Sequence, residues 1–442
     1  MSEEIKNLQE ELNDQMQIRR DKLAEYEADG IYPFGQRFVV KDHAKDIKND
    51  FLNYEDQPVV IAGRLMTMRS HGKTAFANIR DLSGDIQVYF RKDVLGEDNY
   101  KYVKMLDIGD IVGIEGHVFK THSGEVTIKV DKLTLLSKAL RPLPEKWHGL
   151  KDTELRYRQR YVDLIVNPEV RDTFVKRSKI VAKIREYMMN DGFMEVETPM
   201  MHPIPGGAAA RPFITHHNAL DIDIYMRIAP ELYLKRLIVG GMERVFEMNR
   251  CFRNEGIDNR HNPEFTTIES YQAYGDVEDA IRLTENLVSY CAQEVLGTQE
   301  ITYQGTEINL TPPWNRITMA EGVKKYTGED FDAVTTVEEA RAIADRLNVE
   351  YTNNDGIGKI LNACFEDYVE ENLIQPTIVY GHPKEISPLA KASRENPLAT
   401  ERFEAFIYGR ELANGFSELN DPIDQKQRFL DQLKEREAGD DE

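Results

Sequence analysis

The stretch FRNEGIDNRHNPEF, residues 252–265, is predicted to form the tip of a β-hairpin and to decide the fold around it. The run before it, ERVFEMNRC, has the alternation of a strand, and continuing that alternation places Arg253 and Glu255 on one face. Between the two legs, GIDNRHN has the composition of a turn and carries His261 and Asn262. Charged and polar side chains therefore gather at one end of the hairpin.

The returning leg of the hairpin, PEFTTIESYQAY, aligns Phe265, Glu269 and Tyr271 on one face by the same period of two. A guanidinium fork suits a phosphate, a flat ring suits a nucleobase, and carboxylates suit an ammonium or a metal-bound group. The hairpin is thus a candidate nucleotide site. A surface hairpin held by salt bridges is the alternative, and the hairpin alone does not separate the two.

A second polar group lies in FEAFIYGRELANGFSELND, residues 403–421. Glu404 and Glu411 flank a glycine turn, so pairing of the two flanking strands would bring them together. Two carboxylates beside a phosphate site can hold Mg²⁺, with phosphate oxygens completing the octahedron. Farther along, three alternating residues share one face: Asn414, Phe416 and Glu418. An exposed acidic hairpin is the alternative interpretation.

Two further stretches have features of a ligand site. VETPMMHPIPGGAAARPFITHH contains Gly206 and Gly207 next to three alanines, and such small residues allow backbone to approach a ligand or partner closely. In RIAPELYLKRL, Glu231 stands where a strand passes into a helix, directly after Pro230, which suits the start of a helix. Taken alone, each stretch is a weak signal.

Residues 57–136 contain five short alternating runs: PVVIAGRLMTMRS, TAFANIRDL, DIQVYFRKD, DIVGIEGHVFKT and EVTIKVDKLTLL. Turns separate the runs, and a helical insert, YKYVKML, precedes the fourth. This order is typical of the OB-fold barrel, which binds oligonucleotides on the face of its central strands. Four residues are expected on or near that face: Phe76, Gln87, Arg64 and Arg69. For Phe76, a place in the barrel core is an equal alternative.

The remaining chain mixes helices and strands without the pattern of a parallel α/β fold. Residues 3–29 are predicted as an amphipathic helix that includes Ile5, Leu8 and Leu12, and residues 155–193 as a long helix. Neither a P-loop nor a GxGxxG sequence is present. The sequence therefore predicts an α+β protein with an N-terminal helix, an OB-fold barrel, and a domain built on a mainly antiparallel sheet flanked by helices.

Composition restricts the class of protein and its compartment. The 442 residues suffice for two or more domains, and the 41% hydrophobic and 30% charged residues are typical of a globular protein. No stretch reaches the roughly 18 apolar residues of a membrane span. The 3 cysteines form no CxxC pair, which predicts a reducing cytoplasm and no thiolate metal site. The net charge of −21 disfavours nucleic acid as a partner, although residues 57–150 carry a small excess of Lys and Arg.

Together these stretches resemble the bacterial lysyl-tRNA synthetases, a family of class II aminoacyl-tRNA synthetases in the aspartate, asparagine and lysine subgroup. GFMEVETPMM, with Pro199, is similar to motif 1, the dimer-interface segment, and FRNEGIDNRHNPEF is similar to motif 2. GGAAARPF, RIAPELYLKRL and ANGFSELND are similar to lysine-specific stretches. The resemblance implies an N-terminal helix and lead-in at 1–56, an anticodon-binding OB-fold at 57–145 and a class II catalytic domain at 146–442.

The resemblance also implies an activity and the residues that serve it. The activity is ATP-dependent formation of lysyl-adenylate from L-lysine and transfer to tRNA(Lys), by a cytoplasmic homodimer that uses Mg²⁺ and binds no membrane. The implied ATP-binding residues are Arg253, which is also catalytic, Glu255, His261, Asn262 and Phe265; the implied magnesium ligands are Glu404 and Glu411. The implied lysine-binding residues are Gly207, Glu231, Glu269, Tyr271, Asn414, Phe416 and Glu418. The implied anticodon-binding residues are Phe76, Gln87, Arg64 and Arg69.

One part of the family pattern has no counterpart in this sequence. The family's third motif, a glycine-rich stretch of the form GxGxxxGxxR, should follow ELND after a helix, but the sequence ends at Glu442 after the helix DQKQRFLDQLKEREAGDDE. The expectation is that the sequence is a fragment of a longer synthetase. If the polypeptide ends at Glu442, adenylation is expected to be severely reduced, and lysine-dependent pyrophosphate exchange would test this.

Two other functions remain open from the sequence. A catalytically inactive tRNA-binding chain would keep the OB-fold without the reaction, whereas the retained Arg253, Glu404 and Glu411 favour an enzyme. An aspartyl- or asparaginyl-tRNA synthetase would share the architecture. Glu269 and Glu418 oppose that alternative, because an acidic substrate requires a cationic partner at those positions.

Overall fold

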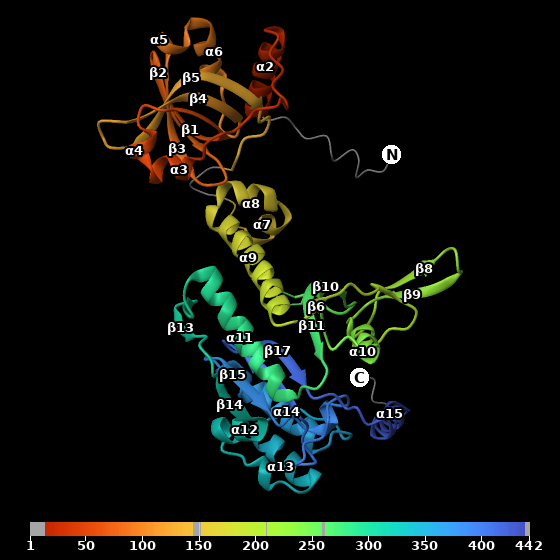
Figure 1. Ribbon diagram of the computed structural model, residues 1–442. Coiled ribbons are helices and arrows are strands. Elements are labelled where there is room, and N and C mark those ends of the chain that lie inside the picture. The colour runs from red at the N-terminus through yellow and green to blue at the C-terminus, as the bar shows by residue number, and fades with distance from the viewer. Residues whose placement is uncertain (1–13, 145–149, 151, 209, 259–260, 438–442) are drawn as a thin grey trace. The chain divides into compact units, whose positions relative to one another are not determined.

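The computed structural model describes residues 14–144, 150, 152–208, 210–258 and 261–437 (Figure 1). The chain divides into two compact units, Met1–Asp172 and Thr173–Glu442. The three-part division predicted from the sequence, with boundaries after residues 56 and 145, stays a prediction. The predicted apolar positions Ile5, Leu8 and Leu12 lie outside the described residues. No helix in the described part of the chain combines the length and the apolar composition that crossing a membrane requires.

A closed β-barrel with the strand order β1-β2-β3-β5-β4 forms the centre of the first unit (Figure 1). Its strands are β1 (Pro58–His71), β2 (Thr74–Arg80), β3 (Asp85–Arg91), β4 (Ile111–Lys120) and β5 (Val126–Ser137). Neighbouring strands are antiparallel except for β3 and β5, which are parallel. The five strands and the OB-fold predicted from the alternating runs are confirmed.

Alternation decides which side chains fill this barrel. Along β2 and β3, buried and half-buried residues follow one another strictly. Ala75, Ala77 and Val88 point into the core. Phe76 belongs to the other set and lies on the outer face of the barrel, half-buried, so its place in the core is excluded.

Helices close the ends and sides of the barrel core. They are α2 (Asp14–Ala28), α3 (Ala44–Asn49), α4 (Phe51–Tyr54), α5 (Lys92–Leu95) and α6 (Glu97–Met105). Tyr26 of α2, Ile47 of α3 and Val103 of α6 belong to the same buried cluster as the strands. The helical insert predicted before the fourth strand is α6.

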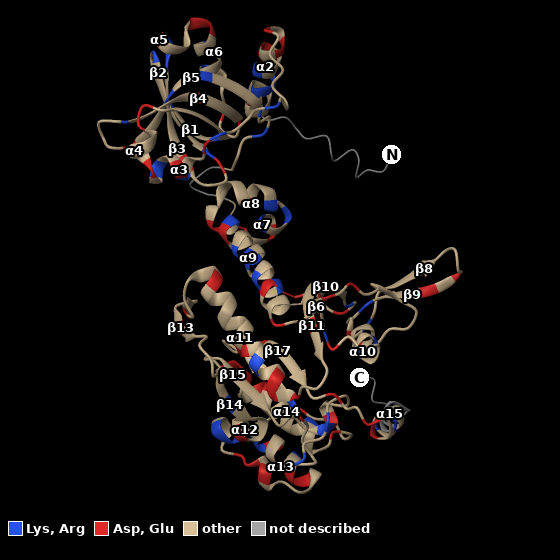
Figure 2. Cartoon of the chain, in the orientation of Figure 1, with Lys and Arg blue, Asp and Glu red and all other residues tan. Residues whose placement is uncertain are grey.

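The long helix predicted over residues 155–193 is wrong in one respect, because it is broken twice. It consists of α7 (Thr153–Arg158), α8 (Arg160–Val166) and α9 (Pro168–Asn190). The backbone leaves the helical region at Gln159 and at Asn167. Pro168 explains the second break, since a proline disfavours the helical conformation of the residue before it. Charges of both signs are interspersed along α9 (Figure 2).

The second unit contains the hairpin predicted around residues 252–265. Its legs are β10 (Arg244–Phe252) and β11 (Glu264–Gln272), which pair without a register shift; β6 (Met194–Glu195) lies parallel to β10. A separate sheet has the order β7-β9-β8, with β7 (Met201–His202), β8 (Ile214–His217) and β9 (Ile222–Met226). Helix α10 (Glu231–Val239) follows β9 and packs beside the hairpin.

A four-stranded sheet carries the other candidate residues of the second unit. Its order is β14 (Asn315–Thr318), β15 (Thr377–Tyr380), β16 (Arg402–Phe406) and β17 (Glu411–Phe416). Only β14 and β15 are parallel among these neighbours. Helix α11 (Val277–Leu296) packs on this sheet, with Ile281 against Phe403 in one buried cluster. The α+β class with mainly antiparallel sheets and flanking helices is confirmed.

A helical subdomain packs against the same sheet. Its elements are α12 (Met319–Thr327), η1 (Phe331–Ala333), α13 (Val337–Leu347), α14 (Ile357–Tyr368), η2 (Glu370–Asn372) and η3 (Lys384–Ile386). Phe365 of α14 and Phe406 of β16 meet in its core, with ring centroids 5.8 Å apart. The remaining elements are β12 (Glu300–Tyr303), β13 (Thr306–Asn309) and α15 (Pro422–Glu437).

Candidate functional site

The β10–β11 hairpin places Arg253 directly after the last residue of β10. Its backbone N–H donates to the carbonyl of Pro263 at 2.9 Å, which continues the pairing of the two legs. The guanidinium lies over the ring of Phe265, 5.2 Å from the centroid. Its Nε is buried and has no hydrogen-bond partner among the described residues. Because a buried donor without a partner is costly, this group is suited to receive an anion.

The other candidate nucleotide residues line the exposed tip of the hairpin. Glu255 accepts a hydrogen bond at 3.2 Å from the backbone N–H of Arg211, which links the hairpin to the stretch GGAAARPF. The ring of His261 is held by the carboxylate of Asp258 at 2.8 Å. Asn262 donates to the backbone carbonyl of Glu264 at 3.0 Å. Each of these three side chains thus has a hydrogen-bond partner in the described part of the chain, and Glu255, His261 and Asn262 are all exposed.

Glu404 and Glu411 lie on adjacent antiparallel strands, as their pairing across the glycine turn predicted. Glu404 lies opposite Asn414 and Phe406 opposite Glu411 in the β16–β17 register. Arg402 donates to Glu404 at 2.5 Å, and His382 Nε2 lies 3.4 Å from the same carboxylate. Burial opposes ionisation of Glu404, but His382 and Arg402 outweigh it and lower its pKa.

The second carboxylate of this pair is less well compensated. Burial and then the charge of Glu404 raise the pKa of Glu411, while Arg253 acts in the opposite direction. Burial also raises the pKa of Glu370, on η2, to about 7, and Glu404 and Glu411 add to this shift. The end of the hairpin and the β16–β17 pair thus share one electrostatic environment, in which negative charge exceeds positive charge.

These carboxylates fit a magnesium ion that is shared with phosphates. No described group of three or more His, Cys, Asp or Glu residues has the arrangement of a protein-only metal site. Mg²⁺, however, is usually bound through one or two carboxylates together with substrate phosphates. Glu404 and Glu411 supply two such carboxylates near Arg253, and the raised pKa of Glu411 reflects a charge that a cation would compensate.

Five of the candidate lysine-binding residues converge on one place, which we call the ammonium cluster: Glu231, Glu269, Tyr271, Phe416 and Glu418. Tyr271 donates to Glu269 at 3.4 Å. Burial and then Glu231 raise the pKa of Glu269 to about 7. Burial also raises the pKa of Glu418, and Glu231 adds to the shift. Three carboxylates facing two aromatic rings form a suitable environment for an ammonium group.

The two remaining lysine-binding candidates differ in how closely they join this cluster. Gly207 has a φ of 94°, and a Cβ there would lie 3.1 Å from Cβ of Glu231, so a larger residue would push against the cluster. The glycine is therefore required by both conformation and space. Asn414 instead lies opposite Glu404 in the strand register and is exposed. It lies on the same face of β17 as Phe416, two residues nearer to Glu411.

Lys235, which the sequence did not indicate as a site residue, lies within the ammonium cluster. Its Nζ is 2.5 Å from Glu231 and 2.9 Å from Glu418. The same atom lies 6.0 Å from the ring centroid of Tyr271 and 5.9 Å from that of Phe416. Its position four residues after Glu231 was the only signal, and such Glu–Lys pairs are common on ordinary helix surfaces.

On the barrel, the candidate anticodon residues form an aromatic and polar face. Phe76 stacks on Tyr89 with centroids 4.4 Å apart, and Tyr89 lies 6.1 Å from Phe119. Gln87, on the same face, accepts a hydrogen bond from Thr127 at 2.8 Å. Arg69 lies opposite Phe76 across the β1–β2 pair and is exposed. Tyr89 and Phe119 were missed, although alternation in DIQVYFR places Tyr89 beside Gln87 on the outer face.

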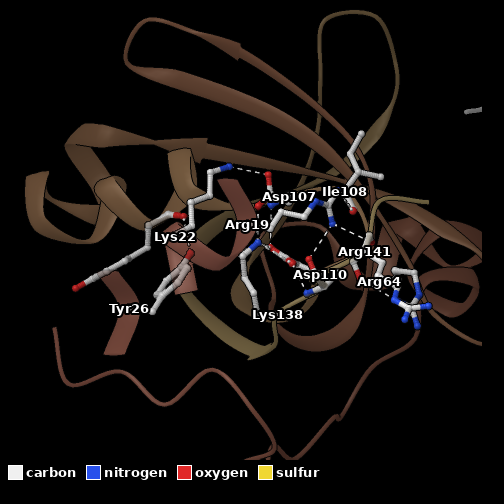
Figure 3. A network of polar contacts seen from close by, with 12 residues as sticks. Arg19, Lys22, Tyr26, Arg64, Asp107, Ile108, Asp110, Lys138 and Arg141 are labelled. Atoms are coloured by element: carbon white, nitrogen blue, oxygen red, sulfur yellow. Dashed lines mark hydrogen bonds and ion pairs between the residues drawn. The ribbon is translucent and has the colours of Figure 1, made fainter. Parts of the chain in front are cut away.

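Arg64 lies away from this aromatic group. Its guanidinium donates to the carbonyl of Gly109 at 2.8 Å, beside the buried polar network drawn in Figure 3. A register shift between Leu65 and Thr67 separates Arg64 from the part of β1 that carries Arg69. Burial lowers the pKa of Arg64. The structure thus brings Phe76, Gln87 and Arg69 together, but not Arg64.

Comparison with known proteins finds two family matches. Residues 152–442 match the family described as tRNA synthetases class II (D, K and N). Residues 59–136 match the OB-fold nucleic acid binding domain.

Comparison with curated proteins finds close relatives over the full chain. A lysine–tRNA ligase of Thermoanaerobacter pseudethanolicus is 59% identical over 442 residues, which cover 100% of this chain and 89% of the relative. A lysine–tRNA ligase of Bacillus subtilis is 57% identical over 449 aligned residues, covering 100% of this chain and 90% of the relative. A lysine–tRNA ligase of Carboxydothermus hydrogenoformans is 58% identical over 98% of this chain and 89% of the relative.

Proposed function

The chain belongs to the class II tRNA synthetases of the D, K and N group, and within them to the lysine–tRNA ligases; from this premise we propose how its residues carry out the reaction. The enzyme uses ATP to convert L-lysine to lysyl-adenylate and transfers the lysyl group to the 3′ end of tRNA(Lys). The observation that carries the residue assignment is the convergence of three carboxylates and two rings in the ammonium cluster. Two members of this cluster, Glu269 and Tyr271, lie on the hairpin that leads to Arg253, whose Nε has no hydrogen-bond partner among the described residues.

In the first step, the carboxylate of lysine attacks the α-phosphorus of ATP and pyrophosphate leaves. Arg253 binds the α-phosphate and the lysine carboxylate, and its partnerless Nε supports this role. Phe265 stacks on adenine, while Glu255, His261 and Asn262 hold the nucleotide at the hairpin tip. The chemistry requires no protein nucleophile, because orientation of two bound substrates can itself supply roughly 7–11 kcal/mol of the barrier.

The metal chemistry of the family is assigned to the β16–β17 pair. Glu404 and Glu411 would hold Mg²⁺, which when bound supplies charge neutralisation at the phosphates. The place of Glu411 beside Glu404 on the paired strand supports this assignment, because burial and Glu404 raise the pKa of Glu411 and a bound cation would favour its ionised form.

Selection of lysine is assigned to the ammonium cluster together with Gly207 and Asn414. Glu418 and Tyr271 recognise the ε-ammonium, Glu231 and Glu269 complete its negative surroundings, and Phe416 adds an aromatic wall. A neutral analogue would leave buried carboxylates without a cation, and such unpaired polar groups give strong discrimination.

In the second step, the terminal ribose hydroxyl of tRNA attacks the carbonyl of lysyl-adenylate and AMP leaves. The barrel reads the anticodon, with Phe76 stacking on a base and Gln87 and Arg69 contacting its edge and backbone. The stacked Phe76–Tyr89 pair on the outer face supports this, since aromatic platforms bind single-stranded bases. Arg64, which donates to Gly109, is assigned only a supporting role at this face.

A homodimer formed through the motif 1 region is also part of the proposal. Met189, Met194 and Met201 are 53%, 56% and 59% exposed, and exposed apolar groups of this kind mark association surfaces. The Met201→Asp variant should shift the sedimentation velocity from dimer to monomer, whereas Leu398→Asp, at a position that is 79% exposed elsewhere in the same unit, should not. Identical sedimentation of both variants would contradict this interface. The cytoplasm as compartment rests on 3 buried, unpaired cysteines.

The test of the function is amino-acid-dependent ATP–pyrophosphate exchange by the purified 442-residue chain. The exchange that occurs should depend on L-lysine and not on aspartate or asparagine, and its rate is expected to be severely reduced if the polypeptide ends at Glu442. Exchange that depends on aspartate or asparagine would contradict the assignment of the ammonium cluster. The three relatives named above are lysine–tRNA ligases, and they favour neither the aspartyl/asparaginyl alternative nor the inactive tRNA-binding alternative.

A further inference from the structure

Lys235 is the cation of the ammonium cluster that the chain itself provides. Its side chain is 22% exposed, and its two carboxylate partners, Glu231 and Glu418, are 10% and 37% exposed. Glu231 begins α10, whereas Glu418 follows β17, more than 180 residues later in the chain. Lys235 therefore joins two elements that are distant in sequence and fixes the separation of their carboxylates.

The charges of the ammonium cluster do not balance without a ligand. Glu231, Glu269 and Glu418 are three carboxylates, and Lys235 supplies one cation. With all three carboxylates ionised, the excess of two negative charges equals the two ammonium groups of free lysine, whose carboxylate is assigned to Arg253. A cluster without Lys235 would carry one negative charge more than the substrate can compensate.

The surroundings of Lys235 hold it in its charged form. Burial disfavours the ammonium, but Glu231 and Glu418 outweigh burial and raise the pKa of Lys235. In return, Lys235 opposes the rise in the pKa of Glu418 that burial and Glu231 cause. Among the residues that the structure describes, none forms an ion pair with Glu269. Burial and Glu231 raise its pKa to about 7, while Tyr271, Arg227 and Arg253 act in the opposite direction.

We propose that Lys235 is a positioning residue for substrate lysine: its ammonium bridges Glu231 and Glu418, aims both carboxylates at the ammonium cluster and sets the charge of that cluster to match the substrate. This inference rests on the proposed function and extends it to a residue outside the implied lysine-binding set. Each of the two carboxylates uses one oxygen for Lys235, which leaves the other oxygen for the substrate. Lys235 acts through Glu231 and Glu418 and does not itself react.

The test compares Lys235→Met, which keeps the length of the side chain and removes its charge, with the wild-type chain. The KM for lysine should rise about tenfold or more at pH 7, as expected for losing the support of a charged hydrogen bond, while the KM for ATP stays unchanged. Without Lys235 the carboxylates take up protons more readily, so the KM for lysine should rise further toward pH 6 and recover toward pH 8.5. The readout is the ratio of this KM to that of the wild-type chain, which should grow toward pH 6; a purely structural defect would leave the ratio independent of pH.

Two matched variants sharpen the comparison. Lys235→Arg keeps the charge and should recover most of the affinity for lysine. Arg236→Met removes a cation from the next position of α10. Arg236 is exposed, and its Cζ lies 4.8 Å from the ring centroid of Tyr233. This variant should leave the KM for lysine unchanged.

The outcomes separate this inference from the proposed function. An unchanged KM for lysine in Lys235→Met would overturn the positioning role, and a lower KM would show that Lys235 competes with substrate for the same place. Calorimetric titration with L-lysine gives the same comparison independently of turnover. A wild-type chain that binds no lysine contradicts the proposed function and the inference together. A wild-type chain that binds lysine no better than Lys235→Met contradicts the inference alone.

Discussion

The barrel and the second unit both bury charged side chains, but they differ in how completely those charges are paired. In the barrel, Lys138 and Asp110 are fully buried, and Lys138 donates to Asp110 at 2.9 Å and to Asp107 at 2.5 Å (Figure 3). Asp110 also accepts hydrogen bonds from the backbone N–H groups of Ala139 and Asp107, each at 2.8 Å.

The same network continues through cations of helix α2. Arg19 donates to the carbonyls of Ala139, Arg141 and Ile108, and Lys22 pairs with Asp107 at 2.6 Å. In the second unit, by contrast, Arg253 Nε has no described partner, and Glu269 and Glu370 have their pKa raised to about 7. Saturated charges hold an architecture together, whereas unsaturated charges are positions where a ligand completes the pairing.

The largest effect is expected from breaking the saturated network. Lys138→Met leaves Asp110 buried without its cation and should lower the free energy of unfolding by about 3–5 kcal/mol. Urea unfolding followed by hydrogen exchange of barrel peptides measures this. The control is Lys132→Met, at a pair with Glu115 whose side chains are 67% and 41% exposed, which should cost at most about 1 kcal/mol. Equal losses in both variants would contradict the comparison.

Replacement of Arg253, whose Nε has no partner among the described residues, should lower activity and leave stability nearly unchanged. Arg253→Ala is expected to lower kcat/KM for lysine-dependent exchange about 10²–10³-fold, as for loss of one preorganised charge donor, with little change in Tm. The control is Arg250→Ala on the same strand, where an exposed arginine lies 3.4 Å from Glu264. This control should change the rate only a few-fold. A large fall in Tm with Arg253→Ala would mean that the residue serves the fold.

A smaller effect is expected at the aromatic face of the barrel. Phe76→Ala should weaken binding of tRNA(Lys) by about 1–3 kcal/mol, the usual contribution of one stacked base, and leave exchange without tRNA unchanged. Filter binding and exchange measure the two quantities. Leu52→Ala, at an apolar position of α4 that is 84% exposed, is the control and should bind tRNA like the wild type. If Phe76→Ala binds tRNA(Lys) as tightly as the wild type, the aromatic face of the barrel does not contact the tRNA.

The smallest effect concerns pH. Because Glu269 has a pKa of about 7 in the free chain, it takes up a proton as the pH falls below 7, and the neutral form cannot pair with an ammonium. The affinity for lysine should then fall up to about tenfold per pH unit from this one group. Titration of lysine at pH 5.5 to 8.5 measures the profile. Glu269→Gln should bind weakly and with a flatter profile; an unchanged slope would assign the titration to another group.

Much of the barrel could be predicted from the sequence because alternation alone determines which side chains face inward. The five strands follow the predicted runs closely, and the outer face with Phe76 and Gln87 follows from the same alternation. The contact of Arg64 could not be predicted in this way. Arg64 lies opposite Arg80 in the β1–β2 register, and its guanidinium donates to the carbonyl of Gly109, a tertiary contact that alternation does not reveal.

In the second unit, the sequence predicted the individual helices and strands better than it predicted which side chains meet in the folded chain. The alternation around Arg253 and Glu269 correctly predicted the hairpin. The helix break at Asn167 could also have been predicted, because Pro168 follows it directly in the sequence. Lys235 was not predicted, because a Glu–Lys pair four residues apart is typical of a solvated helix. Its second partner, Glu418, comes from a distant part of the chain, and only tertiary folding reveals that the pair is enclosed.

The uninterrupted pairing of β10 and β11 has a consequence for how the two small substrates are arranged. Phe265 and Tyr271 stand on one face of β11, six residues apart, so the rise of a strand separates them by about 20 Å. If Phe265 binds the base and Tyr271 the ε-ammonium, as proposed, the strand sets the distance between these two ends of the substrates, and side-chain rotation changes that distance only slightly. Inserting one residue between Phe265 and Tyr271 would move one of the two side chains to the opposite face of the sheet. The two substrates would then lie on different faces and could not react.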